Sequence, residues 1–442
     1  MSIYRWALSG FLRRGSCLLQ SNVTAASRHT TNLYTRRRCF SSSPSRSLMD
    51  TSNFTSTQLE VREAVSKLCS QFPDEYWMER DRKEQYPHEL HAAMVRDGWI
   101  GIALPEELGG GGLGISEATM LLNTISQSGA GMAGAQSIHA NVYATQPLAK
   151  FGTDQQNRDW IPDIIQGRSR TCFGVTEPNS GLNTLALTTT ATRSGDNYLI
   201  SGQKIWISSA QVATHMILLA RTTPVSESPK PTHGLSLFYI PFKPDNTTLT
   251  LTRIPKLGAR AIDANQVFFD SYIVPADSLI GTLDAGFSYV LHGMNAERCL
   301  LAGEALGLGY AALKKATKYA RERSVFGAPI GSRQGIQHPL AKAWMGLEAA
   351  KLATYHAAKL YDEGVDAKVV GTAANTAKYL AAEAAFEACE RAVLTLGGMG
   401  YSEEFHVERY LRECFIPRIA PVSREMIMNY VGERVLGLPR SY

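Results

Sequence analysis

The spacing of hydrophobic and polar residues divides the chain into three stretches. Between residues 56 and 168, apolar residues recur at the three- and four-residue intervals of amphipathic helices. A capping signal, Ser-Thr-Gln-Leu-Glu, predicts the start of a helix over 56–69, and helical spacing resumes over 115–130. A short helix over 146–151 would carry Pro147 in its first turn, where proline is tolerated. We therefore expect a helical N-terminal domain.

Residues 169–284 change to short runs of β-branched and aromatic residues, which Gly, Asn, Asp and Pro separate. The runs span 171–175, 187–193, 198–201, 216–221, 235–240, 248–252 and 267–269. Because no helical stretch lies between them, we expect an antiparallel sheet that forms a barrel or a sandwich. The Pro- and Ser-rich segment 222–233 is expected to be a surface loop of this domain.

Residues 285–442 return to a helical composition that is dense in Ala, Leu and Glu, notably over 349–360, 372–394 and 403–415. Four long helices would pack up and down here, and small Ala residues would allow close approach. The expected fold class is therefore α+β. It comprises a helical domain over 51–168, an antiparallel β-barrel or sandwich over 169–284, and a four-helix bundle over 285–442. The lack of alternating βαβ units argues against a Rossmann nucleotide site.

The charge of the chain is unevenly distributed. The 442 residues include 45 Lys and Arg against 40 Asp and Glu, a formal net charge of +5. Residues 1–50 hold eight Arg, ten Ser and one acid, Asp50, which leaves 37 basic and 39 acidic residues elsewhere. Such a leader is typical of a mitochondrial transit peptide for the matrix, with a processing site near 38–42. Translation from Met49 would instead leave the protein in the cytoplasm. The nearly neutral remainder gives no case for nucleic-acid binding.

Cysteines, histidines and apolar runs exclude several kinds of site. The seven cysteines are scattered, odd in number and never spaced as C-x-x-C, so we expect neither a disulfide framework nor a zinc site. The ten histidines show no ligand spacing such as H-E-x-x-H, and we assign no metal. No segment approaches the roughly 18 apolar residues of a transmembrane segment.

Two glycine-rich segments could bind phosphate. Residues 109–114 follow no predicted strand and lack the Lys-Ser/Thr pair of a phosphate loop, so we reject that reading. The segment Gly-Gly-Met-Gly at 397–400 lies between two predicted helices, and its backbone N–H groups beside a helix N-terminus suit an anion. A plain helix–helix turn is the alternative interpretation of the second segment.

Several motifs occur in a characteristic order. They are Phe-Gly-Val-Thr-Glu-Pro at 173–178, Tyr-Leu-Ile-Ser-Gly-Gln-Lys-Ile-Trp-Ile-Ser at 198–208, Lys-Leu-Gly-Ala-Arg at 256–260, Val-Phe-Phe-Asp at 267–270, Val-Pro at 274–275, Glu-Arg at 297–298, Arg-Ser-Val-Phe-Gly at 323–327 and Gly-Gly-Met-Gly-Tyr at 397–401. Together, over about residues 55–437, they resemble the acyl-CoA dehydrogenase flavoprotein family. Its helix–β–helix order agrees with the pattern read above.

The resemblance implies a non-covalent FAD site between the β domain and the C-terminal helices. Val175 and Thr176 would meet the isoalloxazine ring through backbone and hydroxyl groups. Trp206 and Ser208 would cover its other side, since an indole offers a broad face for stacking.

The resemblance also implies that a neighbouring subunit completes the site, in a homotetramer. Arg323 and Phe326 would belong to that neighbour, with the permanent guanidinium cation of Arg323 on the pyrophosphate. Gln334 and the Gly397-Gly398 turn would hold the rest of the FAD, and Ser423 is a further expected cofactor contact.

Enzymes of this family use a carboxylate to remove the α-proton of an acyl-CoA thioester, while the β-hydrogen leaves as hydride to the flavin. In much of the family that Glu lies in a C-terminal Tyr-Glu-Gly-Thr motif, whereas the aligned stretch here, 420–423, has Pro421 in its place. A minority, similar to isovaleryl-CoA and long-chain dehydrogenases, carries the base in a Glu-Arg pair that opens a helix. We therefore assign Glu297 as base, with Glu304 as the fallback, and expect Arg298 to order the CoA side of the substrate.

A purely structural interpretation of Glu297 is a carboxylate at a helix N-terminus, which the helix dipole favours. Three departures from the family pattern also matter. Pro421 has no N–H for the thioester oxygen, and losing one oxyanion donor costs about 3 kcal/mol. Leu182 replaces a phosphate-contacting Ser, for which Ser180 could substitute in substrate binding, and Leu394 replaces a Gln.

The sequence therefore predicts FAD-dependent α,β-dehydrogenation of an acyl-CoA to the trans-2-enoyl-CoA, with an electron-transfer flavoprotein as the partner that receives the electrons. Ala420, where the family has a bulky Tyr, suggests room for a branched or wide acyl group. Two alternatives stay open. One is a flavin oxidase or hydroxylase of the same fold acting on a non-CoA substrate, and the other is a non-enzymatic assembly partner.

Overall fold

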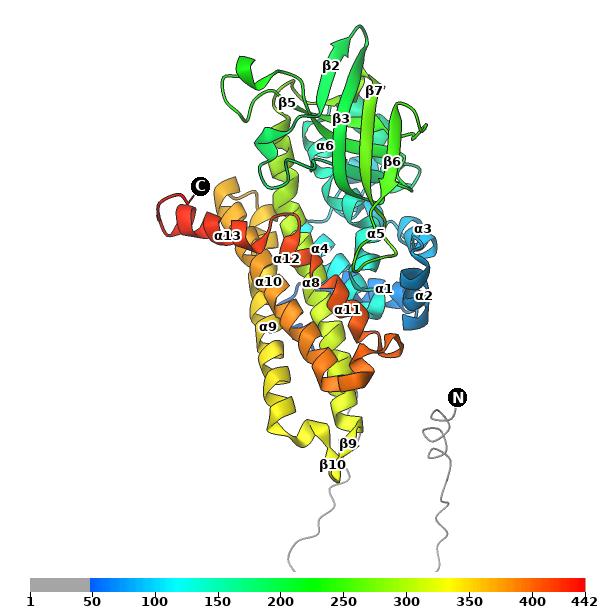
Figure 1. The fold of residues 1–442 in the computed structure, drawn as a ribbon, viewed down its shortest axis with the longest axis vertical. Helices are drawn as coiled ribbons and strands as arrows, with labels where there is room; N and C mark the ends of the chain where they lie inside the picture. The colour runs from blue at the N-terminus through cyan, green and yellow to red at the C-terminus, as the bar shows by residue number, and fades with distance from the viewer. Residues whose placement is uncertain (1–47, 442) are drawn as a thin grey trace, which may run out of the picture. The chain divides into compact units, whose positions relative to one another are not determined.

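The computed structural model describes residues 48–441, so the predicted transit peptide and its processing site lie outside the described residues. Within 48–441 the chain forms an N-terminal group of helices, a sheet and a C-terminal group of long helices, in that order (Figure 1). The mixed α+β class is therefore confirmed. None of the helices in this part of the chain is long and apolar enough to cross a membrane.

The N-terminal helices begin and end largely where local signals predict. They are α1 Ser56–Cys69, α2 Asp74–Lys83, α3 His88–Arg96, α4 Ile115–Ile125, α5 Gly131–Tyr143, α6 Gln146–Phe151 and α7 Asp154–Ile165. At the start of α1, the hydroxyl of Thr55 and the side chain of Gln58 form a capping box, one residue earlier than the sequence signal indicated. The helix predicted over 115–130 is α-helical to Ile125 and continues as a π-helical turn over Ser126–Ala130, where Gly129, with a φ of 114°, makes a kink before α5.

The sheet contains the predicted strands, which are longer than the sequence runs at β3 and β7. The strands are β1 Thr171–Gly174, β2 Thr190–Ser194, β3 Asn197–Ser208, β4 His215–Arg221, β5 Leu235–Pro241, β6 Leu249–Arg253, β7 Ala264–Pro275 and β8 Leu279–Ile280. Their order is β6-β7-β3-β2-β4-β5-β8, with β1 paired to β4. Most pairings are antiparallel, but β4 pairs in parallel with both β1 and β2. The order does not return to its first strand, so the described sheet is open and not a closed barrel.

The C-terminal region differs from the expected four long helices. It has three, α8 Gly286–Glu322, α9 Gln334–Asp362 and α10 Ala367–Leu396, followed by the short α11 Val407–Glu413, α12 Ile416–Ile419 and α13 Arg424–Tyr430. The helix predicted over 403–415 is interrupted because His406 has a left-handed backbone, with φ 63°. The N-terminal helix α4 packs against both α8 and α9. A short hairpin, β9 Ser324–Val325 with β10 Ala328–Pro329, joins α8 to α9.

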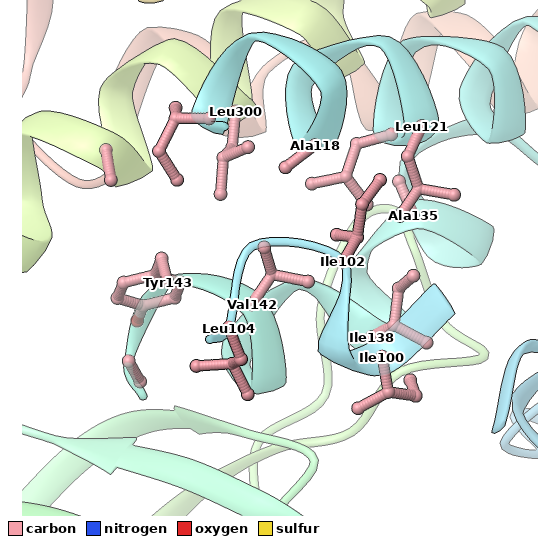
Figure 2. Close-up of a cluster of buried hydrophobic side chains, with 14 of the residues drawn as sticks. Ile100, Ile102, Leu104, Ala118, Leu121, Ala135, Ile138, Val142, Tyr143 and Leu300 are labelled. Carbon is pink, nitrogen blue, oxygen red and sulfur yellow. The ribbon is translucent and has the colours of Figure 1, made fainter. Parts of the chain in front are cut away.

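The core that positions the site lies between α4, α5 and α8. Figure 2 shows Ala118 and Leu121 of α4, Val142 of α5 and Leu300 of α8 directed into the same buried cluster. Close approach of α4 and α8 depends on small residues, since a Cβ added to Gly303 would lie 2.7 Å from the Thr119 side chain. This packing fixes the central turns of α8 against the N-terminal helices.

Candidate active site

Two carboxylates on α8 are directed toward the N-terminal helices. Glu297 and Glu304 are seven residues apart, so they lie two turns apart on one face of the helix. Glu297 is 9% exposed and Glu304 is fully buried. The expectation that Glu297-Arg298 opens a helix is wrong, because α8 begins at Gly286, three turns earlier. A dipole-stabilised carboxylate at a helix N-terminus therefore does not explain Glu297.

His139 of α5 lies between these two carboxylates. Its Nδ1 is 2.5 Å from Glu304 Oε1, and its Nε2 is 3.9 Å from Glu297 Oε1. Burial by itself would lower the pKa of His139, but the carboxylates of Glu304 and Glu297 outweigh it and raise that pKa to about 10. The ring is therefore an imidazolium at neutral pH, paired with one carboxylate and close to the other.

Aromatic contacts connect this cluster to the sheet. The rings of His139 and Tyr143 are 4.8 Å apart, and Tyr143 meets the ring of Phe173 at 5.3 Å. Phe173 belongs to β1, which leads directly into Val175 and Thr176. Burial, followed by the charge of Glu297, raises the pKa of Tyr143 well above its usual range, so its hydroxyl stays protonated.

A buried ion pair holds the loop that contains Val175 and Thr176. The Nζ of Lys204 lies 2.9 Å from Glu177 Oε1 and donates to the carbonyl of Val175 at 3.0 Å. The N–H of Ile205 donates to the carbonyl of Thr176 at 2.9 Å. Burial opposes ionisation of Glu177, but Lys204 and hydrogen bonds from a neighbouring loop lower its pKa to about 2. The loop is thereby tied to β3, next to Trp206.

The two predicted flavin contacts on β3 are at the surface. Trp206 is 55% exposed and has a φ of 62°, at a point where the register of β3 against β7 shifts. Ser208, two residues later, is also exposed. Core packing therefore does not explain Trp206, and its indole offers an open face beside Thr176 for a flat ring.

The remaining predicted cofactor residues gather elsewhere. Arg323 and Phe326 lie at the hairpin between α8 and α9, where Phe326 is 94% exposed. Gln334 is the first residue of α9, and Gly397-Gly398 follows the end of α10. In Figure 1 the hairpin and the sheet lie at opposite ends of α8. The 25 helical steps from Glu297 to Glu322 alone correspond to about 38 Å of helix.

This second group fits an anionic cofactor. The N-cap residue of α9, Arg333, makes no side-chain capping bond, so helix N–H groups are left for a ligand. A Cβ added to Gly397 or Gly398 would meet nothing within 4 Å, so the backbone of this turn is open to approach. Exposed Arg323 adds a permanent cation. These features suit the pyrophosphate end of the FAD that the sequence implies. The residues around Thr176 and Trp206 suit its flavin ring.

The 420–423 loop is bonded to α10, which packs against α8. The carbonyl of Val422 accepts a 2.6 Å hydrogen bond from Lys378 of α10, whose side chain is 1% exposed. Burial and the nearby Arg298 lower the pKa of Lys378 to about 8. Arg298 is buried and donates to Asn295 Oδ1 at 2.7 Å, while its Nε has no hydrogen-bond partner. Ser423 caps α13 by accepting from the N–H of Met426 at 3.3 Å.

The polar replacement suggested for Leu182 is not favoured by the geometry. Ser180 is buried, and its hydroxyl donates to the carbonyl of Asn183 within the same turn. Leu182 is exposed, as is Leu394 beside the second group. In this arrangement the Ser180 hydroxyl is not presented to a ligand, and its substrate role stays a prediction.

The sequence reasoning missed three buried charged groups. They are His139, Lys378 and the Lys204–Glu177 pair. His139 and Lys378 interrupt stretches rich in small and apolar residues, and Lys204 and Glu177 lie within the quoted motifs, but in each case the partner lies on another element. Residues 48–441 contain no cluster of His, Cys, Asp and Glu that could hold a metal ion.

Comparisons with known protein families match three consecutive parts of the chain. Residues 55–168 match the profile described as acyl-CoA dehydrogenase, N-terminal domain. Residues 172–272 match the middle domain, and residues 284–436 match the C-terminal domain.

Curated relatives carry the same description. The chain is 37% identical to acyl-CoA dehydrogenase fadE12 of Mycobacterium bovis, over 89% of this chain and all of the relative. It is 32% identical to the mitochondrial short-chain specific acyl-CoA dehydrogenase of Bos taurus, over 86% of this chain and 92% of the relative.

Solved structures show the same fold. Butyryl-CoA dehydrogenase of Megasphaera elsdenii matches with a TM-score of 0.81 and 28% identity, over 88% of this chain and 100% of that one. A chain described with the electron transferring flavoprotein of Acidaminococcus fermentans gives 0.82 and 30%, over 88% and 100%. The prolyl acyl carrier protein oxidase AnaB gives 0.80 and 26%, over 87% and 100%.

Proposed function

The chain belongs to the acyl-CoA dehydrogenase family, and from that premise we propose that it converts an acyl-CoA thioester to the trans-2-enoyl-CoA with Glu297 as base. The family makes it an oxidoreductase with FAD as cofactor, not a non-enzymatic assembly partner. When bound, FAD supplies the acceptor for the β-hydride. Glu297 takes the α-proton, so that both hydrogens of the saturated bond are accounted for.

The assignment of Glu297 as base rests on its position on α8, next to the ring contacts that lead to the loop of Val175 and Thr176. Its carboxylate is nearly buried, and the His139–Tyr143–Phe173 contacts lead from it to Val175 and Thr176. Glu304 is less suited, since it is fully buried and already bonded to His139 at 2.5 Å. Pro421 leaves no carboxylate at the alternative family position.

The chain's other residues support binding and orientation. Lys204 and Glu177 hold the Val175-Thr176 loop in place, and the indole of Trp206 offers a stacking face beside it. Arg298 and Lys378 are buried cations near Glu297, and a nearby positive charge favours an acyl group whose carbonyl gains negative charge during the reaction.

Oligomerisation is part of the proposal. Arg323 and Gln334, which we expect at the FAD pyrophosphate, lie at one end of α8. The sheet with Trp206, which we expect at the flavin ring, lies at the opposite end. One FAD can contact both groups only if a second copy supplies one of them. We infer a homotetramer in which each site is completed by a neighbour. The 94% exposed Phe326 lies beside Arg323 in this hairpin, where a neighbouring copy would cover it.

The electron acceptor and the location are also proposals. An electron-transfer flavoprotein is supported by the similarity to the chain described with that protein in Acidaminococcus fermentans. The composition of residues 1–50 supports import into the mitochondrial matrix. A reporter fused behind these residues is expected to enter mitochondria, and the same fusion with the eight Arg replaced by Gln is expected to stay outside.

A second candidate is an oxidase acting on a carrier-bound or other non-CoA substrate. Pro421 favours it, because proline removes one N–H donor from the expected thioester site. The exposed Leu182, where the family has a phosphate-contacting Ser, points the same way. The similarity to the prolyl acyl carrier protein oxidase AnaB also supports this candidate.

The test is anaerobic titration of the purified, yellow protein with a panel of acyl-CoAs of different length and branching. We expect one thioester to bleach the flavin absorbance and release an enoyl-CoA, and Glu297→Gln to lower the bleaching rate by about 100-fold or more. Glu60→Gln, an exposed carboxylate on α1, is the matched control and should behave like the wild type.

The other outcomes are equally informative. Undiminished bleaching in Glu297→Gln contradicts the base assignment. A flavoprotein that no acyl-CoA bleaches, but that reacts with carrier-bound acyl groups and oxygen, supports the second candidate. A purified chain with no affinity for FAD contradicts both.

A further inference from the structure

We propose that His139 is a positioning residue of the catalytic site, anchored by Glu304, which orients the carboxylate of Glu297 and supplies a balancing positive charge. The inference deepens the proposed function and rests on Glu297 being the base. It concerns three side chains from two helices, of which only Glu297 belongs to a family motif of this sequence.

The geometry is asymmetric in a way that suits such a role. The Nδ1 of His139 is 2.5 Å from Glu304, a tight charged hydrogen bond that fixes the plane and the direction of the ring. The opposite nitrogen, Nε2, is thereby directed to Glu297, at 3.9 Å. At that distance the ring and the Glu297 carboxylate form an ion pair but not a short hydrogen bond. Glu297 is therefore attracted to the ring but keeps the freedom to turn toward a substrate.

The helical spacing explains why one ring reaches both acids. Glu297 and Glu304 lie two turns apart on α8, on the face that packs against α5. An imidazole in its charged form has two N–H donors on opposite sides, one for each carboxylate. Neither Lys, with one charged end, nor Gln, with no charge, can replace it in both contacts.

Electrostatics in this buried place support a charged ring. Two carboxylates on opposite sides of one ring repel each other when both are ionised, and a cation between them relieves that repulsion. The same carboxylates hold the pKa of His139 up to about 10 against the effect of burial. Arg298 and Lys378 are two further buried cations that interact with Glu297.

The other titratable groups near α5 do not compete for His139. Tyr143 and Cys172 stay neutral, since burial raises the pKa of both well above the usual range. Burial lowers the pKa of His91 on α3 to about 3, so it is neutral as well. Arg409 and Glu413 of α11 pair with each other at 3.6 Å. Glu304 and Glu297 are therefore the charges that act on His139.

The decisive variant is His139→Gln, which keeps a polar side chain of similar size but cannot be charged. We expect kcat to fall by about 10- to 100-fold, since a misplaced base is costly, with little change in KM. Removing a neighbouring cation favours the protonated form of a carboxyl. The acid limb of the pH–rate profile is therefore expected to move to higher pH. Histidine ¹⁵N NMR should show one imidazolium above pH 8 that His139→Gln removes.

Two further variants separate positioning from general damage. His91→Gln makes the same change at a buried histidine that does not contact the glutamates, and we expect wild-type kinetics. Glu304→Gln removes one negative charge and leaves the charged ring, so its acid limb should move to lower pH, opposite to that of His139→Gln. If His139→Gln fails to fold with flavin, the Glu304→Gln profile and the NMR signal decide the matter.

The outcomes separate this inference from the proposed function. If Glu297→Gln abolishes bleaching while His139→Gln matches the wild type in kcat and in pH profile, positioning is wrong and the base assignment stands. If Glu297→Gln remains active, both are wrong. The charged ring is contradicted if kcat falls in His139→Gln while the acid limb stays in place and the wild type shows no imidazolium signal above pH 8.

Discussion

At the scale of single residues, buried charges decide the local geometry of the site. Lys204 and Glu177 are both almost fully buried, and they hold the loop of Val175 and Thr176 against β3. A pair of this kind is costly to create, because both ions lose water, yet it is much more costly to break. Its value here is therefore the conformation that it specifies next to Trp206.

Replacing one partner tests this directly. In Lys204→Met the carboxylate of Glu177 stays buried without its cation, and the free energy of unfolding should fall by about 3–5 kcal/mol. FAD retention should weaken in parallel, because the loop loses its tie to β3. Lys230→Met, on a surface loop, is the control, and urea denaturation with flavin fluorescence measures both effects. Unchanged stability in Lys204→Met would contradict the role of the pair.

The pH dependence has a definite sign. The folded-state pKa of Glu177 is depressed to about 2 from an ordinary value of 4.5. Its contribution to stability is therefore fully present above about pH 4.5 and is lost as the pH falls toward 2. The stability difference between the wild type and Glu177→Gln should shrink over that window, as measured by urea denaturation at a series of pH values.

At the scale of elements, the contact between α4 and α8 places the glutamates. Gly303 directly precedes Glu304 on α8 and meets Thr119 of α4. Because the nearest atoms include the backbone oxygen of Thr119 at 2.8 Å, an added methyl group cannot be accommodated by side-chain rotation alone. The glycine therefore controls how closely α8 approaches the N-terminal helices.

A matched pair of Gly→Ala variants separates packing from helix propensity. Gly303→Ala should lower the free energy of unfolding by about 1–3 kcal/mol through overpacking, and should slow turnover by shifting α8. Gly346→Ala on α9, whose Cβ would lie 3.6 Å from Ala384, should be neutral or stabilising by up to about 1 kcal/mol. Thermal unfolding of both variants is the measurement. Equal effects in the two would show that close packing at Gly303 is unimportant.

At the scale of the whole molecule, the residues expected at the flavin ring and those expected at the pyrophosphate lie at opposite ends of α8. If neighbouring copies complete each site, Glu297→Gln removes the base that one chain supplies. Arg323→Ala removes the cation that the other chain supplies, so each variant alone is inactive. A mixed pair of the two variants then contains one intact site, with Glu297 from one chain and Arg323 from the other.

Co-expression of the two inactive variants is therefore expected to restore activity. Random pairing predicts about a quarter of the wild-type activity, since half of the pairs are mixed and each has one intact site of two. Mixing the separately purified, stable oligomers without exchange should restore none. Absence of activity in verified hybrids would contradict a site shared between chains.

Local signals account for what the sequence predicted well. The capping residues of α1 and the Pro147 turn of α6 act within one helical turn, so they are readable from neighbouring residues. The β-rich middle was likewise evident from residue type. The motifs indicated the family and nominated Glu297, Trp206 and Arg323, but they could not show that α8 begins three turns before Glu297.

The sequence by itself therefore determined the class of fold, the family and the residues nominated for catalysis and cofactor binding, because these depend on patterns of neighbouring residues. Only the tertiary structure decided that His139 meets Glu297 and Glu304, 158 and 165 residues further along the chain. It also decided that the sheet stays open and that the cofactor-type residues form two separate groups. Such facts follow from packing between distant segments, where a contact depends on the positions of whole helices and strands and not on the residues nearby in sequence.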